Sequence, residues 1–408
     1  MSLITVTPET LKTATEGLPI GLKTAISFAT RIRVGSIQAI LPDGREILIK
    51  GDVAGPEARI TIHSPAFATR TMKRGVIGVA ESYLAGDWSS DTLTEFLEVF
   101  CRNASLIQSL ANDRPLLQFW LNISHWFNRN TKRGSKRNIY AHYDLGNRFY
   151  SKWLDPSMTY SSAIYDHPEE DLSNAQRRKY ESLAKQIALT PDDDVLEVGC
   201  GWGGFAEFAA SQVGAKVTGI TISKEQFDFA QKRIFEAGLN EKVDIRLEDY
   251  RDTQGQFDKI ASIEMFEAVG EKYWPTYFKM LRDRMKPGGK AGIQVITIQD
   301  EMFPHYKRRP DFIQKYVFPG GMLPSPSALR NVASKSGLAL SDEKIFGLDY
   351  ARTLAEWRDR FFAAWPEIKP LGFDDRFKRL WEFYLAYCEA GFKAGNIDVR
   401  QVVYSHAS

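Results

Sequence analysis

Two alternating apolar runs mark the first zone of the chain. Residues 36–51 place IQAIL and REILIK on either side of Asp43-Gly44, and this spacing around a tight-turn dipeptide predicts a β-hairpin. Alternation in residues 58–65 predicts a further strand. Residues 1–125 therefore read as a small domain of mixed helix and strand, and they carry no recognisable catalytic motif.

The second half of the chain alternates longer apolar runs with helical segments. The predicted strands are 193–198, 215–223, 242–250, 257–266 and 290–298, the last after a turn at 286–289. The predicted helices between them include 205–214 and 224–239. Such alternation favours a parallel, doubly wound α/β sheet. A Pro- and aromatic-rich segment, about 300–375, interrupts it, and the pattern after it predicts helices at 357–368 and 375–395 and a closing strand at 397–405.

Composition narrows the class of protein. The 408 residues are 43% hydrophobic and 25% charged, which is typical of a globular chain. The formal net charge of +2 gives no overall field that would favour a nucleic-acid partner. No run of 18 apolar residues predicts a spanning helix, and the first residues lack the apolar stretch of a signal peptide. We therefore expect a cytoplasmic protein.

Several kinds of catalytic site find no support in the sequence. The six histidines form no ligand-spaced pair and the three cysteines are scattered, so no metal site is expected. No G-x-S-x-G elbow indicates a nucleophilic serine. Aromatic residues make up 12% of the chain, which suits either a well-filled core or an aromatic-lined pocket for an apolar ligand.

A basic segment separates the two halves. Residues 128–138 (NRNTKRGSKRN) hold five basic and no acidic side chains. The segment reads either as a solvated linker or as a contact for an anionic surface such as phospholipid head groups. Both interpretations stay open at this point.

A glycine-rich turn directly follows the strand VLEV. Gly199, Gly201 and Gly203 allow a tight turn and a close approach of the backbone to a ligand, and Glu197 precedes them. The second strand ends in GITIS, without the acid that a dinucleotide enzyme uses for its ribose. The third ends near Asp249, which could accept a hydrogen bond from an adenine amino group. This arrangement resembles class I methyltransferases that use S-adenosyl-L-methionine.

Further motifs narrow the resemblance. The segments HYDLGNRFY, MTYSSA, VLEVGCGWGG, GITISKEQ, EDYRD and MFEAVG together resemble the cyclopropane fatty acid synthase family and its mycolic acid relatives, over residues 135–405. Residues 1–125 more loosely resemble the extra N-terminal domain of the members that act on phospholipids. The resemblance implies a class I methyltransferase fold, with a doubly wound sheet and a smaller mixed N-terminal domain. It also implies transfer of the methyl group of S-adenosyl-L-methionine to a double bond in a lipid acyl chain.

The resemblance assigns cofactor contacts residue by residue. Together with Glu197 and the glycine loop, the matching positions are Tyr160, Ser161, Thr221, Ser223, Gln226 and Asp249.

The resemblance also implies a bound bicarbonate as general base. In the family, a cysteine, a glutamate, a histidine and a tyrosine surround this anion. The glutamate matches Glu267 and the tyrosine matches Tyr350, but the cysteine position is Ser162 and the histidine position is Ile296. Glu267, Tyr350 and Ser162 are therefore the candidate catalytic residues.

These departures bear on the product. Methyl transfer to an alkene leaves a carbocation, and a base must then remove a proton. Proton loss from the new methyl group with ring closure gives a cyclopropane, whereas proton loss that forms a double bond leaves a methyl- or methylene-branched chain. Because Ile296 cannot hold an anion through its side chain, the branched product is slightly favoured. The alternatives are a small-molecule N- or O-methyltransferase and a lipid-binding relative that has lost catalysis.

The expected organisation follows from these assignments. Residues 1–125 form an accessory domain for lipid, membrane or dimer contact, 126–140 a basic linker, and 141–408 the methyltransferase domain with an acyl-chain insertion at about 300–375. The expected partners are unsaturated phospholipid acyl chains and, peripherally, the anionic inner face of the membrane, with Lys307, Arg308 and Arg309 as lipid-phosphate contacts or a solvated loop. A homodimer is compatible with the sequence, and nucleic acid is not expected.

Overall fold

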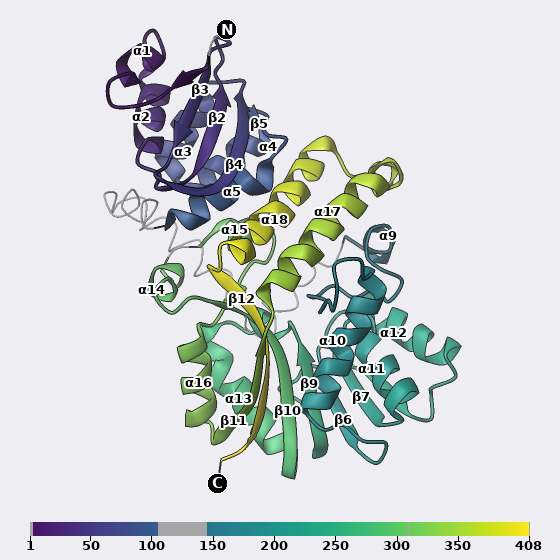
Figure 1. Cartoon of the computed structure of the whole chain (residues 1–408). Coiled ribbons are helices and arrows are strands. Elements are labelled where there is room, and N and C mark those ends of the chain that lie inside the picture. Colours follow the sequence, from purple (N-terminus) through teal and green to yellow (C-terminus); the bar gives the residue numbers. More distant parts are fainter. Residues whose placement is uncertain (1–2, 105–144, 309, 408) are drawn as a thin grey trace. The chain divides into compact units, whose positions relative to one another are not determined.

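The computed structural model describes residues 3–104, 145–308 and 310–407, and its contacts divide it into two compact units. The first unit takes the described parts of 1–123 and 309–315 together with 372–396; the second takes the rest. Figure 1 labels most elements of both. The basic segment 128–138 lies outside the described residues.

A five-stranded sheet forms the centre of the first unit, in the order β1-β3-β2-β4-β5. Its strands are β1 (Ile4–Thr5), β2 (Val34–Ile40), β3 (Glu46–Lys50), β4 (Val53–Ile62) and β5 (Trp88–Ser89). Its helices are α1 (Leu11–Thr15), α2 (Ile20–Ala29), α3 (Ala66–Arg74), α4 (Val76–Leu84), α5 (Leu93–Arg102), most of α15 (Phe312–Tyr316) and α18 (Asp375–Lys393). The predicted hairpin is confirmed as the antiparallel pair β2–β3, with Gly44 at a φ of 84° in the turn.

Helix α18 comes from the end of the chain but packs in the first unit. Its Phe383 lies 5.6 Å from Tyr83 of α4 between ring centroids, and the buried Glu389 accepts a 2.9 Å hydrogen bond from the Thr94 hydroxyl of α5. The unit boundary therefore differs from the predicted one, which assigned 375–395 to the methyltransferase domain. Amphipathic spacing predicts that a helix has an apolar face, but it does not identify the partner that the face covers.

The second unit is built on a seven-stranded sheet in the order β11-β12-β10-β9-β6-β7-β8. Its strands are β6 (Asp194–Val198), β7 (Lys216–Thr221), β8 (Val243–Leu247), β9 (Phe257–Ile263), β10 (Met285–Ile298), β11 (Leu338–Ile345) and β12 (Ile397–His406). Its helices are α9 (Asn147–Tyr150), α10 (Leu172–Gln186), α11 (Gly204–Phe208), α12 (Lys224–Glu236), α13 (Trp274–Arg284), α14 (Phe303–Tyr306), α16 (Pro326–Lys335) and α17 (Gly347–Ile368). Strands β6 to β10 pair in parallel, and β12 is antiparallel to β10, so the predicted doubly wound sheet is confirmed.

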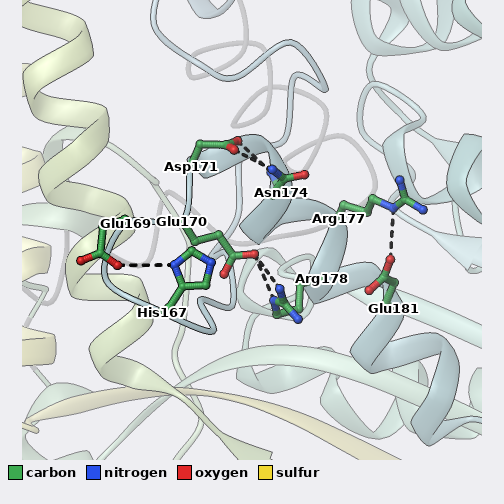
Figure 2. Close-up of a pocket in the computed structure, with 8 residues that line it drawn as sticks. All are labelled: His167, Glu169, Glu170, Asp171, Asn174, Arg177, Arg178 and Glu181. Carbon is green, nitrogen blue, oxygen red and sulfur yellow. Dashed lines mark hydrogen bonds and ion pairs between the residues drawn. The ribbon is translucent and has the colours of Figure 1, made fainter.

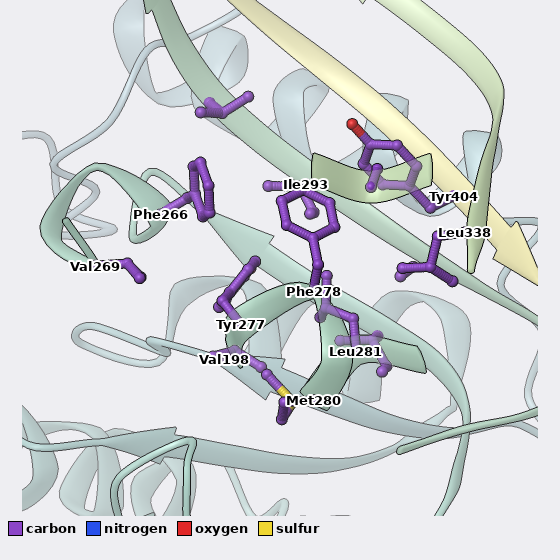
Figure 3. Packing of buried hydrophobic residues seen from close by; sticks show 14 of the residues in the cluster. Val198, Phe266, Val269, Tyr277, Phe278, Met280, Leu281, Ile293, Leu338 and Tyr404 are labelled. Atoms are coloured by element: carbon purple, nitrogen blue, oxygen red, sulfur yellow. The ribbon is translucent and has the colours of Figure 1, made fainter. Parts of the chain in front are cut away.

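The two faces of this sheet carry separate cores. Val195 and Val217 pack with α10, α11 and α12, whereas Leu196, Val198 and Ile293 pack with α13 and α16. Figure 3 shows the second of these cores, where the rings of α13 meet Ile293 and Tyr404. Neighbouring residues of one strand thus face opposite cores, which is why these strands read as continuous apolar runs.

Two details differ from the sequence prediction. The expected turn at 286–289 is a bulge inside β10, where the register to β9 shifts between Met285 and Lys290. Position 289 requires glycine because the Cβ of any other residue would lie 2.8 Å from the carbonyl oxygen of Asp258. Strand β11 was not predicted, because all but its first residue are exposed and its sequence lacks alternation. Among the described residues, no helix is long and apolar enough to cross a membrane.

Candidate functional site

The predicted site residues gather at one edge of the second unit. Glu197 is the last residue but one of β6, Thr221 ends β7, and Glu267 follows β9 in the short helical turn Phe266–Ala268. The carboxyl ends of parallel strands share one edge of the sheet, and open α/β sheets bind ligands there. The strand order alone therefore brings together residues that are far apart in sequence.

The glycine loop has the conformation that the sequence suggests. Gly199, Gly201 and Gly203 have φ values of 80°, 52° and 82°, a region that disfavours other residues. A Cβ on Gly199 would lie 2.6 Å from Cγ of Met265, whereas one on Gly201 would meet nothing within 4 Å. Gly199 is thus required by close packing, and the backbone at Gly201 stays open to a ligand.

Glu197 is a buried carboxyl group beside this loop. Only 3% of the residue is exposed, and its Oε2 atom has no hydrogen-bond partner among the described residues. Burial raises the pKa of Glu197 to about 8, against a backbone hydrogen bond from Ala206 that lowers it. A buried acceptor without a partner is costly, so this atom suits the cationic amino end of S-adenosyl-L-methionine.

Three residues that the resemblance assigns to the cofactor, Thr221, Ser223 and Gln226, form a connected group at the start of α12. The Thr221 hydroxyl donates to Oε1 of Gln226 at 3.0 Å. Ser223 is the N-cap of α12, and its hydroxyl accepts from the Gln226 backbone N–H at 3.3 Å. Capping of α12 is therefore one reason why a serine occupies position 223. The predicted adenine acceptor Asp249 is held by Arg251, whose Nε and Nη2 donate to its two oxygens at 2.8 and 2.6 Å.

An aromatic cluster surrounds Tyr160. Its ring centroid lies 5.2 Å from that of Tyr150, 5.7 Å from Trp153 and 5.1 Å from Trp357. Trp357 also lies 6.1 Å from the ring of Tyr350, so one indole joins a predicted cofactor contact to a predicted catalytic residue. The segment before this cluster, His142 to Asp144, lies outside the described residues.

The neighbouring Ser161 has a partner that sequence reasoning missed. Its hydroxyl accepts a 2.6 Å hydrogen bond from Nζ of Lys179, a fully buried lysine on α10. Burial lowers the pKa of Lys179 to about 7, although the carboxylates of Glu264, Asp155 and Glu197 oppose this shift. The run RRKY reads as an exposed basic stretch, so nothing in the sequence separates Lys179 from its neighbours.

Two of the three candidate catalytic residues converge on a glutamate that the sequence did not single out. Glu264 accepts from the Ser162 backbone N–H at 2.8 Å and from the Tyr350 hydroxyl at 2.6 Å. Glu267 instead accepts from the Ile296 backbone N–H at 2.6 Å. The sequence feature that could have identified Glu264 is an acid inside the apolar run SIEMF, at the end of a buried strand.

Glu264 and Glu267 have different surroundings. Oε2 of Glu267 is buried and has no hydrogen-bond partner among the described residues. Burial, and then the charge of Glu264, raise the pKa of Glu267 to about 8. Carboxyl groups with such different surroundings divide acid and base roles in many enzymes.

The raised pKa of Glu267 predicts how stability depends on pH. The folded state holds this proton more tightly than the unfolded chain, so its contribution is complete below the unfolded pKa and is lost as pH rises through about 8. Glu267→Gln should therefore gain about 3 kcal/mol in free energy of unfolding relative to wild type between about pH 5.5 and about pH 9. Chemical denaturation at both pH values measures this. An equal difference between the two proteins at both values would contradict the assigned protonation.

A polar hollow of about 380 Å³ lies elsewhere on α10 and the loop before it (Figure 2). It is lined by His167, Glu169, Glu170, Asp171, Asn174, Arg177, Arg178 and Glu181. Ion pairs fill it, such as Arg178 to Glu170 at 2.8 Å, and none of the predicted site residues lines it. Within the described ranges, no group of three or more His, Cys, Asp or Glu is arranged to hold a metal ion.

Comparison with known proteins identifies the family. The family model described as mycolic acid cyclopropane synthetase matches residues 130–402. The chain belongs to this family. It is 40% identical over 360 residues to the tuberculostearic acid methyltransferase of Mycobacterium tuberculosis, covering 85% of this chain and 83% of that protein. It is 37% identical over 365 residues to the cyclopropane-fatty-acyl-phospholipid synthase of Escherichia coli, covering 88% and 92%.

Solved structures agree with this membership. The cyclopropane synthase MmaA2 from Mycobacterium tuberculosis is 28% identical, with a TM-score of 0.62 over 66% of this chain and 97% of that one. The mycolic acid cyclopropane synthase CmaA1, complexed with SAH and CTAB, gives the same values. The chain is therefore an S-adenosylmethionine-dependent methyltransferase of the cyclopropane fatty acid synthase type, and the predicted class I methyltransferase fold is confirmed.

Proposed function

We propose that this family member methylates a double bond in an unsaturated phospholipid acyl chain and leaves that chain methyl-branched and unsaturated. The observation that carries the proposal is the continuous contact from Tyr160 through Trp357 to Tyr350 and Glu264. It joins the predicted cofactor contacts to a carboxyl group through aromatic rings. An acyl carbocation needs such a setting, which keeps water away and offers aromatic faces beside a base.

Cofactor binding is assigned to residues at the sheet edge. Glu197 would receive the amino end of S-adenosyl-L-methionine, and the open backbone at Gly201 would lie along it, with Thr221 and Gln226 on the ribose side. Tyr160 and Ser161 would complete the contacts, and the buried Lys179 fixes the Ser161 hydroxyl. When bound, the cofactor supplies an electrophilic methyl group.

The residues present do not fit the bicarbonate that the resemblance implies. Two of its four side-chain positions are Ser162 and Ile296. The Tyr350 hydroxyl and the Ser162 N–H already donate to Glu264, and the Ile296 N–H donates to Glu267. The donors that would surround a separate anion are thus engaged by the chain's own carboxyl groups. We therefore assign no step to bicarbonate.

The relatives support an acyl substrate. Two of its relatives are a tuberculostearic acid methyltransferase and a cyclopropane-fatty-acyl-phospholipid synthase, and the chain covers most of both proteins. Membrane contact belongs to the proposal as well. Arg308 is exposed, whereas Lys307 pairs with Glu271, and Arg309 lies outside the described residues. Of the three basic residues, Arg308 is the one that we assign to lipid phosphates.

The test supplies methyl-labelled cofactor together with monounsaturated phospholipid vesicles, saturated vesicles, or soluble amines and phenols. We expect label in the fatty acids of the monounsaturated lipid alone. Label in an amine or phenol would favour a small-molecule methyltransferase, and vesicle binding without label would favour a lipid-binding relative that has lost catalysis. Either result would contradict the proposal.

A further inference from the structure

Glu264 combines backbone strain with a fully engaged carboxyl group. It has a φ of 49°, a left-handed conformation that is unfavourable for a residue other than glycine. Its Oε1 atom accepts from the Ser162 N–H and from the Gln294 amide, both at 2.8 Å, and its Oε2 accepts from the Tyr350 hydroxyl at 2.6 Å. Strain that persists at such a point is characteristic of functional sites.

A hydrogen-bond network through two buried glutamines holds the Glu264 carboxyl group in place. Gln401 on β12 lies opposite Gln294 on β10 and donates to its oxygen at 3.1 Å, which directs the Gln294 amide nitrogen to Glu264. The Ser182 hydroxyl in turn donates to the oxygen of Gln401 at 2.7 Å. Both glutamines are fully buried. A buried polar network is worthwhile only when every member is satisfied, so this one holds the Glu264 carboxylate in a single position.

We infer that the Glu264 carboxylate is the general base of the reaction, in the place that the family resemblance gives to bicarbonate. This inference rests on the proposed function. The Ser162 and Tyr350 positions of the resemblance contact the anion, and here both donate to Glu264. The chain therefore supplies its own carboxyl group directly after the end of β9.

The electrostatic setting suits this role. Burial raises the pKa of Glu264, while the hydrogen bonds from Tyr350, Gln294 and Ser162 and the charge of Lys179 lower it. The net direction is upward, and a more basic carboxylate removes a proton more readily once it is ionised. Besides Tyr350 and Lys179, the titratable group Glu267 acts on the same surroundings, and its own pKa is raised partly by the charge of Glu264.

The step balances in atoms and electrons. The electron pair of the double bond forms a carbon–carbon bond to the methyl group of the sulfonium donor, whose sulfur keeps the pair of the broken bond. The adjacent chain carbon is left as a cation. Glu264 then takes a proton from a chain carbon beside it, and the released C–H pair becomes a new double bond. The carboxylic acid returns its proton to solvent, and no oxidant or reductant is needed.

Glu264→Gln tests the assignment with little disturbance of the fold. The glutamine oxygen can accept from Ser162 and Gln294, and its NH₂ group can donate to the Tyr350 oxygen. We expect kcat for lipid methylation to fall about 10²–10⁴-fold, the usual contribution of a general base. Affinity for S-adenosylhomocysteine should stay close to wild type, and the matched control Glu241→Gln, an exposed glutamate, should keep full activity.

Three further readouts separate a base from a structural residue. Formate or acetate should restore part of the activity of Glu264→Ala. The wild-type rate should be the same in bicarbonate-free buffer as with added bicarbonate. Gln294→Leu removes a hydrogen bond that lowers the pKa of Glu264, so the acidic limb of its pH–rate profile should shift to higher pH. If Gln294 had only a structural role, Gln294→Leu would lower the rate equally at every pH.

The outcomes distinguish this inference from the proposed function. If wild type transfers methyl groups to lipid and Glu264→Gln does so at the same rate, the base assignment alone is overturned. The same holds if the wild-type rate collapses without bicarbonate and returns when it is added. If wild type transfers no methyl group to lipid under any condition, the proposed function fails, and this inference fails with it.

Discussion

Glu197→Ala should weaken the binding of S-adenosylhomocysteine about 100-fold, because it removes a charge-assisted hydrogen bond worth about 2–3 kcal/mol. The carboxyl group is buried, and its Oε2 atom has no partner among the described residues. A ligand ammonium group would satisfy it. Isothermal titration of the purified protein measures this loss of affinity.

The pH dependence of the same titration identifies the interaction. The pKa of Glu197 is raised to about 8, so below that pH binding of a cationic amino group must first ionise the carboxyl group. Wild-type affinity should therefore rise with pH up to about 8 and then level off. In Glu197→Gln the affinity should be lower and nearly independent of pH. A wild-type affinity that does not change with pH would remove Glu197 from the cofactor site.

Trp357→Ala should lower the free energy of unfolding of the second unit by about 3–5 kcal/mol, the usual cost of deleting a large buried ring. Trp357 is fully buried, and its ring packs against Trp153, Tyr160 and Tyr350. Its loss leaves a void between the predicted cofactor contact and the predicted catalytic tyrosine. Denaturant unfolding followed by fluorescence measures the change.

Trp357→Phe separates packing from catalysis. It keeps an aromatic face, so it should retain more of both stability and turnover than the alanine variant. Phe235→Ala serves as the control, because Phe235 is 71% exposed and its loss should cost less than about 0.5 kcal/mol. Equal unfolding midpoints for Trp357→Ala and wild type would contradict the packing argument.

Sequence reasoning was successful where local pattern and strand order determine structure. The hairpin around Asp43-Gly44, the parallel strands and the glycine turn follow from period and turn chemistry, which act over a few residues. Parallel strand order then brings Glu197, Thr221 and Glu267 to one edge.

Other features depend on long-range contacts that a single sequence does not encode visibly. The sequence pattern of α18 predicts an apolar face without indicating its partner, and only the folded structure shows that this face packs on α4 and α5. Lys179 reads as one of three basic residues, although it alone of the three is buried. Glu264 reads as an interruption of an apolar run, because its donors come from positions up to 102 residues before it and 86 after it.

The pKa values of the two carboxyl groups are both raised by burial, but the contacts that oppose or add to this shift differ. Glu264 accepts hydrogen bonds that favour its charged form, whereas Glu267 has backbone donors and a charged neighbour that disfavours its own ionisation. One carboxylate can then accept a proton while the other stays neutral. Such a division explains how a site could keep a base without recruiting an anion from solution.

The most direct test of this account follows the methyl hydrogens. Wild-type protein is incubated with cofactor carrying a fully deuterated methyl group and with monounsaturated phospholipid, and the released fatty acids are analysed by mass spectrometry before and after hydrogenation. We predict a product that keeps every methyl deuterium and still takes up hydrogen, as a methyl-branched alkene does. A product that has lost one deuterium and resists hydrogenation would be a cyclopropane and would contradict the proposed product. Absence of deuterium from the fatty acids would contradict lipid methylation itself.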